Sequence, residues 1–337
     1  MGREVWVAGF PSFYGGADTE LDHLIDLFRA HDVAVNLVPM FGADQRMTAS
    51  VLARGCSIHE YRADVFQGRT VVSFCNGEFL RLLPEIMAAG RPARVVWFNC
   101  MTWLFDAERE AHRQGWIDYF GFQSRYQRDR LLPQLTGIRP VRSFGYKPYF
   151  NSKRVESAYR EWDGFYRIGR ISRDDESKFA SDTWRIFDRV LVPAALKKQV
   201  FILGYGEKAA AKCGSPPPGL DWLTWSPNAI PAEQFYRTIS TLIHKTGGSR
   251  ENYCRAVVEA YAYRVVPIVE HDYGFPEFIE HGETGFMTSD SDEMSYYASL
   301  LAHDPERHRR MAEAGRRHLE QAISVEQACW EPWMEIL

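Results

Sequence analysis

The stretch ENYCRAVVEAYAYRVVPIVE, residues 251–270, joins a helical segment directly to a strand-like segment. Apolar residues recur at helical spacing in its first part, and RVVPIVE is a short apolar run rich in β-branched residues. A helix that leads straight into a buried strand is the repeating unit of a parallel sheet with helices on both faces. The stretch also carries two glutamates, Glu251 and Glu259, eight positions apart.

Alternation of strands and helices continues on both sides of this stretch. Before residue 150 we expect strands at EVWVAGF, VAVNLVPMF, RTVVSFC and RVVWFNC, separated by helical segments such as TELDHLIDLFRAH. After residue 165 a second series begins, with FYRIGRIS and KQVFILGYG as strands and SDTWRIFDRVLVPAAL as a helix. The sequence therefore predicts an α/β fold of two Rossmann-like, doubly wound domains that face each other across a cleft, with a ligand at the carboxyl ends of the strands.

Size and composition agree with two domains. The chain has 337 residues, of which 45% are hydrophobic and 25% charged, as in globular proteins with more than one core. A polar and aromatic segment at 145–165 separates the two series. We therefore predict an N-terminal domain over 1–150, a C-terminal domain over 151–320, and a helix over 321–337 that packs back on the N-terminal domain.

The charge and the cysteine content indicate which partners and which cellular compartment to expect for this protein. The net charge is −4, and residues 1–150 carry 17 Lys and Arg against 16 Asp and Glu, 17 − 16 = +1, which disfavours nucleic acid, including modified DNA, as a partner. The six cysteines form no C-x-x-C pair and predict reduced thiols without zinc. The stretch MGREVWVAGF reads as a strand rather than a signal peptide, and no apolar run approaches about 20 residues. We expect a cytoplasmic protein without a membrane span, and peripheral membrane binding stays open.

A glycine pair follows the first predicted strand. In FYGGAD, Gly15 and Gly16 allow a ligand to approach the backbone closely, and the helix that follows directs its positive end toward that ligand. An ordinary turn is the competing interpretation.

A basic cluster follows the first strand of the second series. The stretch IGRISRDDESKF places Arg170, Arg173 and Lys178 just after a strand that we expect to end at Gly169. Such a cluster can neutralise a diphosphate without a metal ion. The competing interpretation is a solvated loop in which the acidic residues between Arg173 and Lys178 neutralise the cations.

The two glutamates fit a ligand with two polyol ends. On one helix, eight positions place Glu251 and Glu259 about 80° apart and about 12 Å along the axis, so both can line one groove. Ionised carboxylates accept hydrogen bonds from hydroxyl groups. The competing interpretation is a helix cap at Glu251 and a surface ion pair at Glu259. A further acidic pair, Asp290 and Asp292, precedes a helix and predicts an N-cap rather than a metal site.

Taken together, these stretches resemble a known enzyme family. YGGADTELDHLIDLFRAHDVAV, IGRISRDDESKF, ENYCRAVVEAYAYRVVPIV, GFPEFIEHGETGF and MAEAGRRHLEQ are similar, in this order, to motifs of the retaining glycosyltransferases of family 4, which have the two-domain GT-B fold. The similarity covers most of the chain and is strongest over 165–320. It implies an enzyme that moves a sugar, such as a hexose, from a UDP- or GDP-sugar to an acceptor hydroxyl, with no cofactor and no metal ion.

The resemblance implies roles on the sugar side of the donor. Glu251 would act as a catalytic residue that hydrogen-bonds the donor sugar, supported by the backbone amides of Asn252 and Tyr253. Glu259 would hold the ribose of the nucleotide. Asn99 ends a strand where the family commonly has a histidine, and is the candidate for a contact to the far side of the sugar.

The resemblance also implies roles on the phosphate side. Arg173 and Lys178 would bind the diphosphate and stabilise its charge as it leaves. Arg170, Gly15 and Gly16 would contribute to donor binding. A front-face displacement with retention is the expected mechanism, since the sequence identifies no nucleophilic carboxylate.

Some features leave other functions open. Cys254 stands where the family usually has glycine, which would crowd the sugar pocket. A nucleotide-sugar 2-epimerase of the same fold and a catalytically weak protein that binds sugar nucleotides are the alternatives. The acceptor, whether a glycan, a lipid-linked sugar or a small molecule, is not identified by the sequence.

Overall fold

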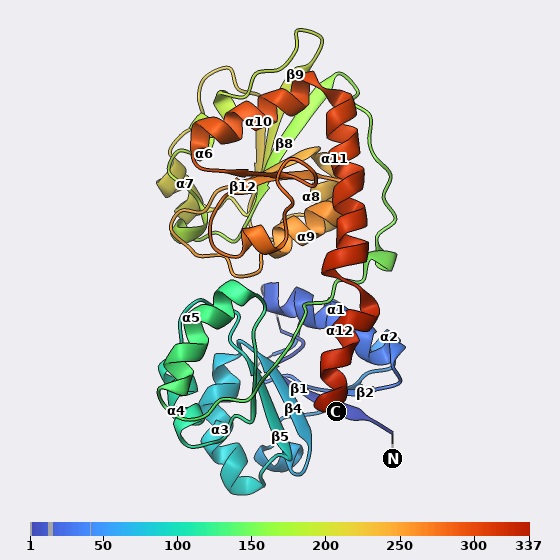
Figure 1. Ribbon diagram of the computed structural model, residues 1–337, viewed down its shortest axis with the longest axis vertical. Coiled ribbons are helices and arrows are strands. Elements are labelled where there is room, and N and C mark those ends of the chain that lie inside the picture. The colour runs from blue at the N-terminus through green and yellow to red at the C-terminus, as the bar shows by residue number, and fades with distance from the viewer. Residues whose placement is uncertain (1, 13–15, 41) are drawn as a thin grey trace. The chain divides into compact units, whose positions relative to one another are not determined.

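The computed structural model describes residues 2–12, 16–40 and 42–337. It consists of two compact units: unit 1 comprises Met1–Asn151 and Ile323–Leu337, and unit 2 comprises Ser152–Ala322. Each unit is a parallel sheet with helices on both faces (Figure 1). The prediction of two doubly wound, Rossmann-like domains is therefore confirmed.

Unit 1 has a seven-stranded parallel sheet in the order β3-β2-β1-β4-β5-β6-β7. Its strands are β1 (Glu4–Ala8), β2 (Ala34–Val38), β3 (Ser57–Ile58), β4 (Thr70–Phe74), β5 (Arg94–Phe98), β6 (Tyr119–Gly121) and β7 (Ser143–Phe144). Its helices are α1 (Gly16–Ala30), α2 (Gln45–Ala53), α3 (Gly77–Ala89), α4 (Asp106–Arg113), α5 (Arg125–Thr136) and α12 (Glu326–Trp330), with the short 3-10 helices η1 (Ala63–Phe66) and η6 (Glu331–Glu335).

Alternating side chains along the strands of unit 1 form two separate cores. On β1, Val5 and Val7 pack with α1, α2 and α12 on one face, whereas Trp6 and Ala8 pack with α3, α4 and α5 on the other. Each of the four is at most 3% exposed. Because successive side chains of a strand point to opposite faces, burial on both faces explains the near-continuous apolar sequence of these strands.

The C-terminal segment packs within unit 1. Trp333 and Ile336 are fully buried in the same core as α1. Phe28 of α1 packs edge-on against Trp333, with ring centroids 4.9 Å apart. Figure 1 shows α12, in red, beside α1. The aromatic residues of this segment complete one face of the sheet.

Unit 2 has a six-stranded parallel sheet in the order β10-β9-β8-β11-β12-β13. Its strands are β8 (Phe165–Ile171), β9 (Lys197–Leu203), β10 (Trp222–Trp225), β11 (Thr241–His244), β12 (Val266–Glu270) and β13 (Phe286–Thr288). Its helices are α6 (Thr183–Asp188), α7 (Glu207–Cys213), α8 (Ala232–Thr238), α9 (Arg255–Ala262), α10 (Ser291–His303) and α11 (Pro305–His318), with the 3-10 helices η2 (Ser152–Arg154), η3 (Glu176–Lys178) and η4 (Phe275–Glu277). A five-residue π-helix, η5 (Leu319–Ile323), follows α11.

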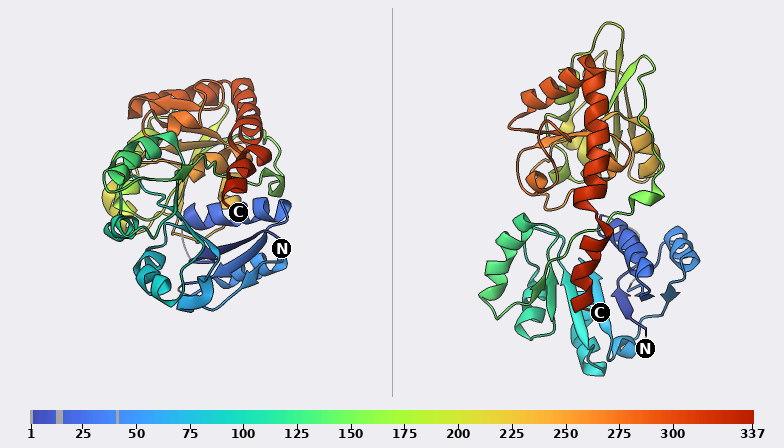
Figure 2. Two further views of the ribbon diagram at one scale, coloured as in Figure 1. Left: turned by 60° about the horizontal axis from the view of Figure 1, so that its bottom comes forward. Right: turned by 45° about the vertical axis from the view of Figure 1, so that its right-hand side comes forward.

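The core of unit 2 also has two faces. Ile168 and Val200 pack with α6, α10 and α11, and Leu242 packs with α8 and α9 on the other face. Figure 2 shows α10 and α11, in red, on one side of this sheet. The predicted helix SDTWRIFDRVLVPAAL is too long, since α6 ends at Asp188. The side chain of Val190 enters the core after the helix has ended, and Pro193 has no amide hydrogen to continue it.

A buried histidine joins α11 to the sheet and should make unit 2 sensitive to acid. His308 is 1% exposed, and its ring nitrogens contact the hydroxyls of Tyr159 at 2.9 Å and Thr241 at 3.2 Å. Burial lowers the pKa of His308 to about 4, whereas an unfolded chain has a histidine pKa of about 6.5. The unfolded chain therefore binds the proton first, and stability falls as pH drops from about 6.5 to about 4, by on the order of 1–3 kcal/mol.

Urea unfolding at a series of pH values checks this prediction. The unfolding midpoint of the wild type should fall over this pH range, and the midpoint of His308→Gln should fall less. His303→Gln, an exposed histidine on α10, serves as the control and should keep the wild-type dependence. Identical pH dependence of the unfolding midpoint in all three proteins would show that His308 is not the source of the acid sensitivity.

Candidate functional site

The loops that follow β8, β11 and β12 meet at the carboxyl edge of the sheet of unit 2. The Gly247 amide donates a hydrogen bond to the Ser177 carbonyl at 2.8 Å, and the Gly274 amide donates to the Glu251 carbonyl at 2.8 Å. A Cβ atom at Gly247 would lie 2.0 Å from the carbonyl oxygen of Phe179. Glycine is therefore required for this close approach, which brings the charged residues of three loops onto one edge.

Glu251 does not lie on the helix that carries Glu259, so this part of the sequence interpretation is wrong. The helix α9 begins at Arg255, and its N-cap residue Cys254 has an extended backbone (φ −87°, ψ 97°). The Glu251 carbonyl accepts the amide hydrogen of Gly274 from the loop after β12. This long-range hydrogen bond holds Glu251 in the loop before α9.

Lys178 and Glu251 form a largely buried ion pair at this edge. Nζ of Lys178 lies 2.6 Å from Oε1 of Glu251, and the two side chains are 19% and 12% exposed. Burial by itself raises the pKa of Glu251, but His244 and Lys178 outweigh it and hold that pKa well below its usual value. The carboxylate is therefore ionised at neutral pH. Oε2 of Glu251 accepts no hydrogen bond from the residues that the structure describes.

Arg170 is buried inside β8 rather than placed in the following loop. The strand extends to Ile171, two residues beyond the predicted end at Gly169. The guanidinium group is 1% exposed and donates a hydrogen bond to the Lys178 carbonyl. Within the described ranges, its Nε and Nη1 atoms have no partner. Arg170 therefore holds the backbone of Lys178 and places a positive charge beneath the site, and its side chain is not presented to solvent.

Arg173 is an exposed cation in the loop after β8. The acidic residues next to it bind backbone amides: Asp174 accepts from Ala209 at 2.8 Å, and Asp175 accepts from Ser177 at 2.8 Å. In the described part of the chain, Arg173 makes no ion pair. The solvated-loop interpretation expects these carboxylates to pair with the cations, and among the residues that the structure describes Arg173 has no such pair.

Glu259 lies in the second turn of α9 and is mostly buried. Its side chain is 16% exposed, and Nε of Arg255 lies 3.9 Å from its Oε1. Burial raises the pKa of Glu259, and Arg255 and the neighbouring Tyr236 of α8 lower it in part. This burial does not fit the competing interpretation of an exposed surface pair.

The remaining predicted donor-binding residues divide between the two units. Asn252 and Tyr253 lie in the turn before α9, and each is 5% exposed. The ring of Tyr253 packs edge-on against Phe278 at 4.9 Å. Gly16 is the first residue of α1 in unit 1, and Gly15 lies outside the described residues. In unit 2, the predicted residues thus lie in the loop after β8 and around the start of α9, except for Arg170, which lies inside β8.

Asn99 is held in a buried network at the carboxyl end of β5. Its side-chain amide donates to the Trp103 carbonyl at 2.9 Å and to the Glu108 carboxylate, and it accepts from the Met101 amide at 2.7 Å. Burial raises the pKa of Glu108 to about 7. Both amide hydrogens of Asn99 are used inside unit 1, so the geometry gives no support to its predicted sugar contact. Trp103, by contrast, is 54% exposed.

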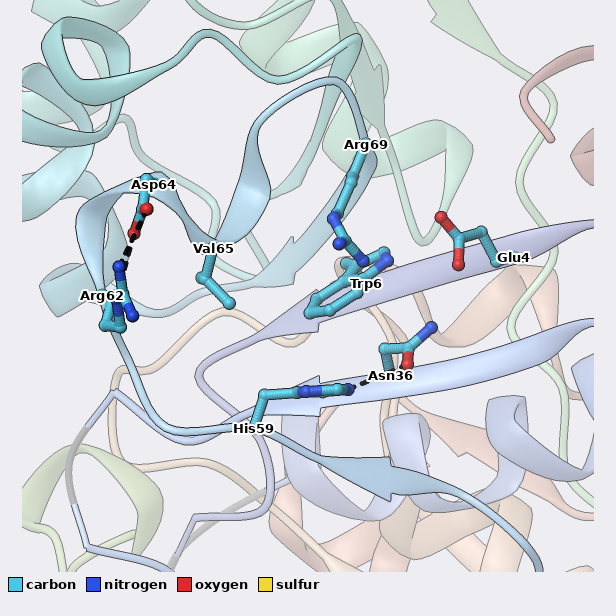
Figure 3. Close-up of a pocket in the computed structure, with 8 residues that line it drawn as sticks. All are labelled: Glu4, Trp6, Asn36, His59, Arg62, Asp64, Val65 and Arg69. Carbon is cyan, nitrogen blue, oxygen red and sulfur yellow. Dashed lines mark hydrogen bonds and ion pairs between the residues drawn. The ribbon is translucent and has the colours of Figure 1, made fainter.

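A hollow of about 420 Å³ lies elsewhere on unit 1, over β1 and β2 (Figure 3). The guanidinium carbon of Arg69 lies 3.7 Å from the ring centroid of Trp6, and the His59 ring lies 4.5 Å from that of Trp6. Two arginines and two carboxylates line the hollow, so its charge selects no single class of ligand. The lining residues are Glu4, Trp6, Asn36, His59, Arg62, Asp64, Val65 and Arg69.

Sequence reasoning missed His244, which ends β11 beside Glu251. Nε2 of His244 lies 3.9 Å from Oε1 of Glu251 and 3.7 Å from Sγ of Cys254. The only signal was a histidine at the end of an apolar strand, just before a glycine-rich loop. The Cys254 side chain is buried and contacts this imidazole, so the structure does not support the expected crowding of a sugar pocket.

Several smaller predictions concern metals, cysteines and membranes. Asp290 is the N-cap of α10 and accepts the Glu293 amide hydrogen at 2.8 Å, as predicted. All six cysteines are free thiols, also as predicted. Across the described ranges, no helix is both long and apolar enough to cross a membrane, and no cluster of three or more His, Cys, Asp or Glu side chains is arranged to hold a metal ion.

Part of the site in unit 2, including Glu251 and Glu259, lies within a segment that has the sequence pattern of a transferase family. Residues 224–318 match the model of the family described as "Glycosyl transferases group 1". This segment includes β11, α9 and the loop after β12, and therefore Glu251 and Glu259. No curated protein sequence matches the chain.

Solved structures of similar fold cover nearly the whole chain. TarM from S. aureus, in complex with Fondaparinux, alpha-GlcNAc-glycerol and UDP, has a TM-score of 0.76 at 9% identity over 99% of both chains. HepE from Anabaena, in complex with UDP and glucose, has a TM-score of 0.68 at 13% identity over 99% of both chains. Sucrose-phosphate synthase from Thermosynechococcus elongatus has a TM-score of 0.68 at 10% identity over 99% of this chain and 96% of its own. These similarities confirm the predicted GT-B fold class.

One glycine contact gives a direct test of how the site is built. A Cβ atom at Gly274 would lie 2.1 Å from the carbonyl oxygen of Asn252. We expect Gly274→Ala to displace the turn before α9 and to cost on the order of 1–3 kcal/mol, visible in calorimetry as a lower Tm. Gly145→Ala is the matched control, because no atom lies within 4 Å of a Cβ there. Equal Tm values for the two variants would mean that the turn tolerates the methyl group.

Proposed function

We propose that this chain is a retaining glycosyltransferase that transfers a hexosyl group from a UDP- or GDP-sugar to an acceptor hydroxyl without a metal ion. The observation that carries the proposal is the ion pair between Lys178 and an ionised Glu251 at the carboxyl edge of unit 2, where the loop of Lys178 also carries the exposed cation Arg173. The family pattern over 224–318 and the GT-B fold support the class of enzyme. The presence of UDP in the HepE and TarM complexes favours UDP as the nucleotide.

The phosphate side of the donor would be bound by cations. A diphosphate presents several anionic oxygens, and charge-assisted hydrogen bonds to such groups are stronger than neutral ones. Arg173 has no ion pair to break among the described residues, and Lys178 has one, with Glu251. We infer that Lys178 exchanges its contact with Glu251 for one with the diphosphate when the donor binds.

The sugar and ribose would be bound by carboxylates. Oε2 of Glu251 is available to accept hydrogen bonds from donor hydroxyls, and the low pKa of Glu251 keeps this oxygen an acceptor. Glu259, four residues into α9, would accept from the ribose hydroxyls. Asn252 and Tyr253 would bring backbone amides to the sugar ring.

Transfer would proceed by front-face displacement. The acceptor oxygen forms a bond to the anomeric carbon on the face from which the diphosphate leaves, and the bond from that carbon to the phosphate oxygen breaks. The acceptor proton passes to an oxygen of the departing diphosphate, so no protein base is required. Arg173 and Lys178 stabilise the negative charge that develops on the leaving group.

A hydrolysis screen of nucleotide sugars tests the proposal without an identified acceptor. Purified full-length protein in excess EDTA should slowly release free hexose and nucleoside diphosphate from one UDP- or GDP-sugar. A 2-epimerase would instead convert the donor to its epimer without releasing the diphosphate. Binding without any product would indicate a protein that only holds sugar nucleotides, and loss of turnover in EDTA that magnesium restores would refute the metal-independent mechanism.

Replacing Glu259 should weaken nucleotide binding rather than change sugar choice. Glu259→Gln removes a charged acceptor, which costs about 1.5–3 kcal/mol, or about 10–150-fold in affinity. Isothermal titration with the free nucleoside diphosphate measures this loss. Glu283→Gln, an exposed glutamate, is the control and should keep wild-type affinity. Unchanged affinity in Glu259→Gln would exclude the ribose assignment.

A further inference from the structure

His244 lies beside Glu251, and the chemistry proposed above does not use it. The residue is 3% exposed, and its Nε2 atom lies 3.9 Å from Oε1 of Glu251 and 3.7 Å from Sγ of Cys254. Its ring packs against Phe275 of η4, with centroids 5.7 Å apart. The end of β11, the turn before α9 and η4 therefore fix the position of this imidazole.

The imidazole of His244 and the thiol of Cys254 are both neutral near pH 7. Burial, and then the charge of Arg170, lower the pKa of His244 to about 4. Burial raises the pKa of Cys254 to about 12. A neutral imidazole carries one N–H group, and an ionised carboxylate can only accept, so the favoured tautomer directs Nε2–H at Glu251. Nδ1, which lacks a partner within the described ranges, is then an acceptor rather than a buried unpaired donor.

Two groups that can donate a hydrogen bond thus face one oxygen of Glu251, at different distances. Nζ of Lys178 lies 2.6 Å from Oε1, whereas Nε2 of His244 lies 3.9 Å from the same atom, beyond hydrogen-bond distance. A bound diphosphate competes for Lys178. The Glu251 side chain is only 12% exposed, and a buried carboxylate that loses its cation needs another donor.

We propose that His244 is a positioning residue for Glu251, which it holds through an Nε2–H hydrogen bond to Oε1 while Lys178 binds the diphosphate. Oε2 of Glu251 is then directed at the hydroxyls of the donor sugar. The thiol of Cys254, 3.7 Å from the same Nε2 atom, packs against the imidazole. This inference rests on the proposed function and adds the residue that orients the sugar-binding carboxylate.

The test compares donor hydrolysis by His244→Leu and His244→Gln with that of the wild type. Leucine keeps the apolar volume and removes the donor, whereas glutamine keeps an N–H group near the position of Nε2. We expect His244→Leu to lower kcat/KM for the donor about 10–100-fold, and to change the affinity for free nucleoside diphosphate less than threefold. The kcat/KM of His244→Gln should stay within about fivefold of the wild-type value. The exposed control His303→Gln should have the wild-type kcat/KM.

A double-mutant cycle with Glu251→Gln separates positioning from folding. In the Glu251→Gln background, His244→Leu should lower kcat/KM for the donor less than about twofold, because the carboxylate that His244 positions is absent. Full activity of His244→Leu, or the same loss in both backgrounds, overturns the inference and leaves the proposed function standing. If His244→Leu does not fold, His244→Asn replaces it, and equal activity of the Asn and Gln variants overturns the inference. A wild-type protein that hydrolyses no nucleotide sugar overturns the proposed function and this inference with it.

Discussion

Arg173→Ala is expected to lower kcat for donor hydrolysis by about 10²–10³, the range for removal of one preorganised donor to a developing charge. The effect should appear in kcat rather than in KM, because charge on the leaving oxygen grows only in the transition state. Arg173 is exposed and makes no ion pair in the described part of the chain, so its removal should leave the fold unchanged. Steady-state kinetics and circular dichroism together check both statements.

Lys178→Ala should cause a similar loss with an added structural effect. Its ammonium group neutralises Glu251 in the absence of the donor, so this variant should also have a lower Tm. The double variant should lose less than the product of the two single losses, because both cations act on one group. If each single variant keeps more than about a third of the wild-type kcat, a loss below 1 kcal/mol, the diphosphate assignment is wrong.

Glu251→Gln is the second variant with a large expected effect. Glutamine keeps the size of the side chain and replaces one oxygen by a donor, so hydrogen bonds from sugar hydroxyls are lost. We expect kcat/KM for the donor to fall about 10–150-fold, corresponding to about 1.5–3 kcal/mol for a charged acceptor. Affinity for the free diphosphate should stay level or rise, because Lys178 is released from its ion pair.

The fall in kcat/KM without a fall in diphosphate affinity distinguishes a role of Glu251 in binding the sugar from a role in binding the phosphates. A structural role for Glu251 would weaken diphosphate binding together with turnover. Glu283→Gln again serves as the control, since this glutamate is exposed. Equal losses in diphosphate affinity and in kcat/KM for Glu251→Gln would contradict the sugar assignment.

Much of the fold was predictable because the central strands are buried on both faces. Val71 and Val72 of β4, for example, are successive residues that are each 0% exposed. Strands buried on both faces in this way have a continuous apolar sequence. The edge strand β10 was not predicted. Its Trp222 and Leu223 are 43% and 46% exposed, so neither alternation nor an apolar run marks it.

The candidate site was predicted in residue type more than in geometry. The sequence identified Arg173, Lys178 and the two glutamates as candidates, but spacing alone placed Glu251 on a helix. The hydrogen bond from the Gly274 amide, 23 positions along the chain, is what holds Glu251 in a loop. Contacts of this kind depend on the assembled sheet, and local periodicity carries no information about them.

The burial of charged side chains also could not be predicted from the sequence. Arg170 is 1% exposed because β8 runs two residues further than its apolar pattern indicates. The pairing of β11 with β12 places His244 beside Glu251. No local sequence motif indicates this pairing.

Hydrogen–deuterium exchange of the full chain, with and without saturating UDP or GDP, tests the central claim most directly. The claim is that the carboxyl edge of unit 2 binds the nucleoside diphosphate of a sugar donor. We expect at least one of the two nucleotides to slow exchange in residues 173–178 and 246–259, and in no other segment of unit 2 to the same extent. Absence of protection with both nucleotides, or protection centred on residues 59–69 of the hollow in unit 1, would contradict the account.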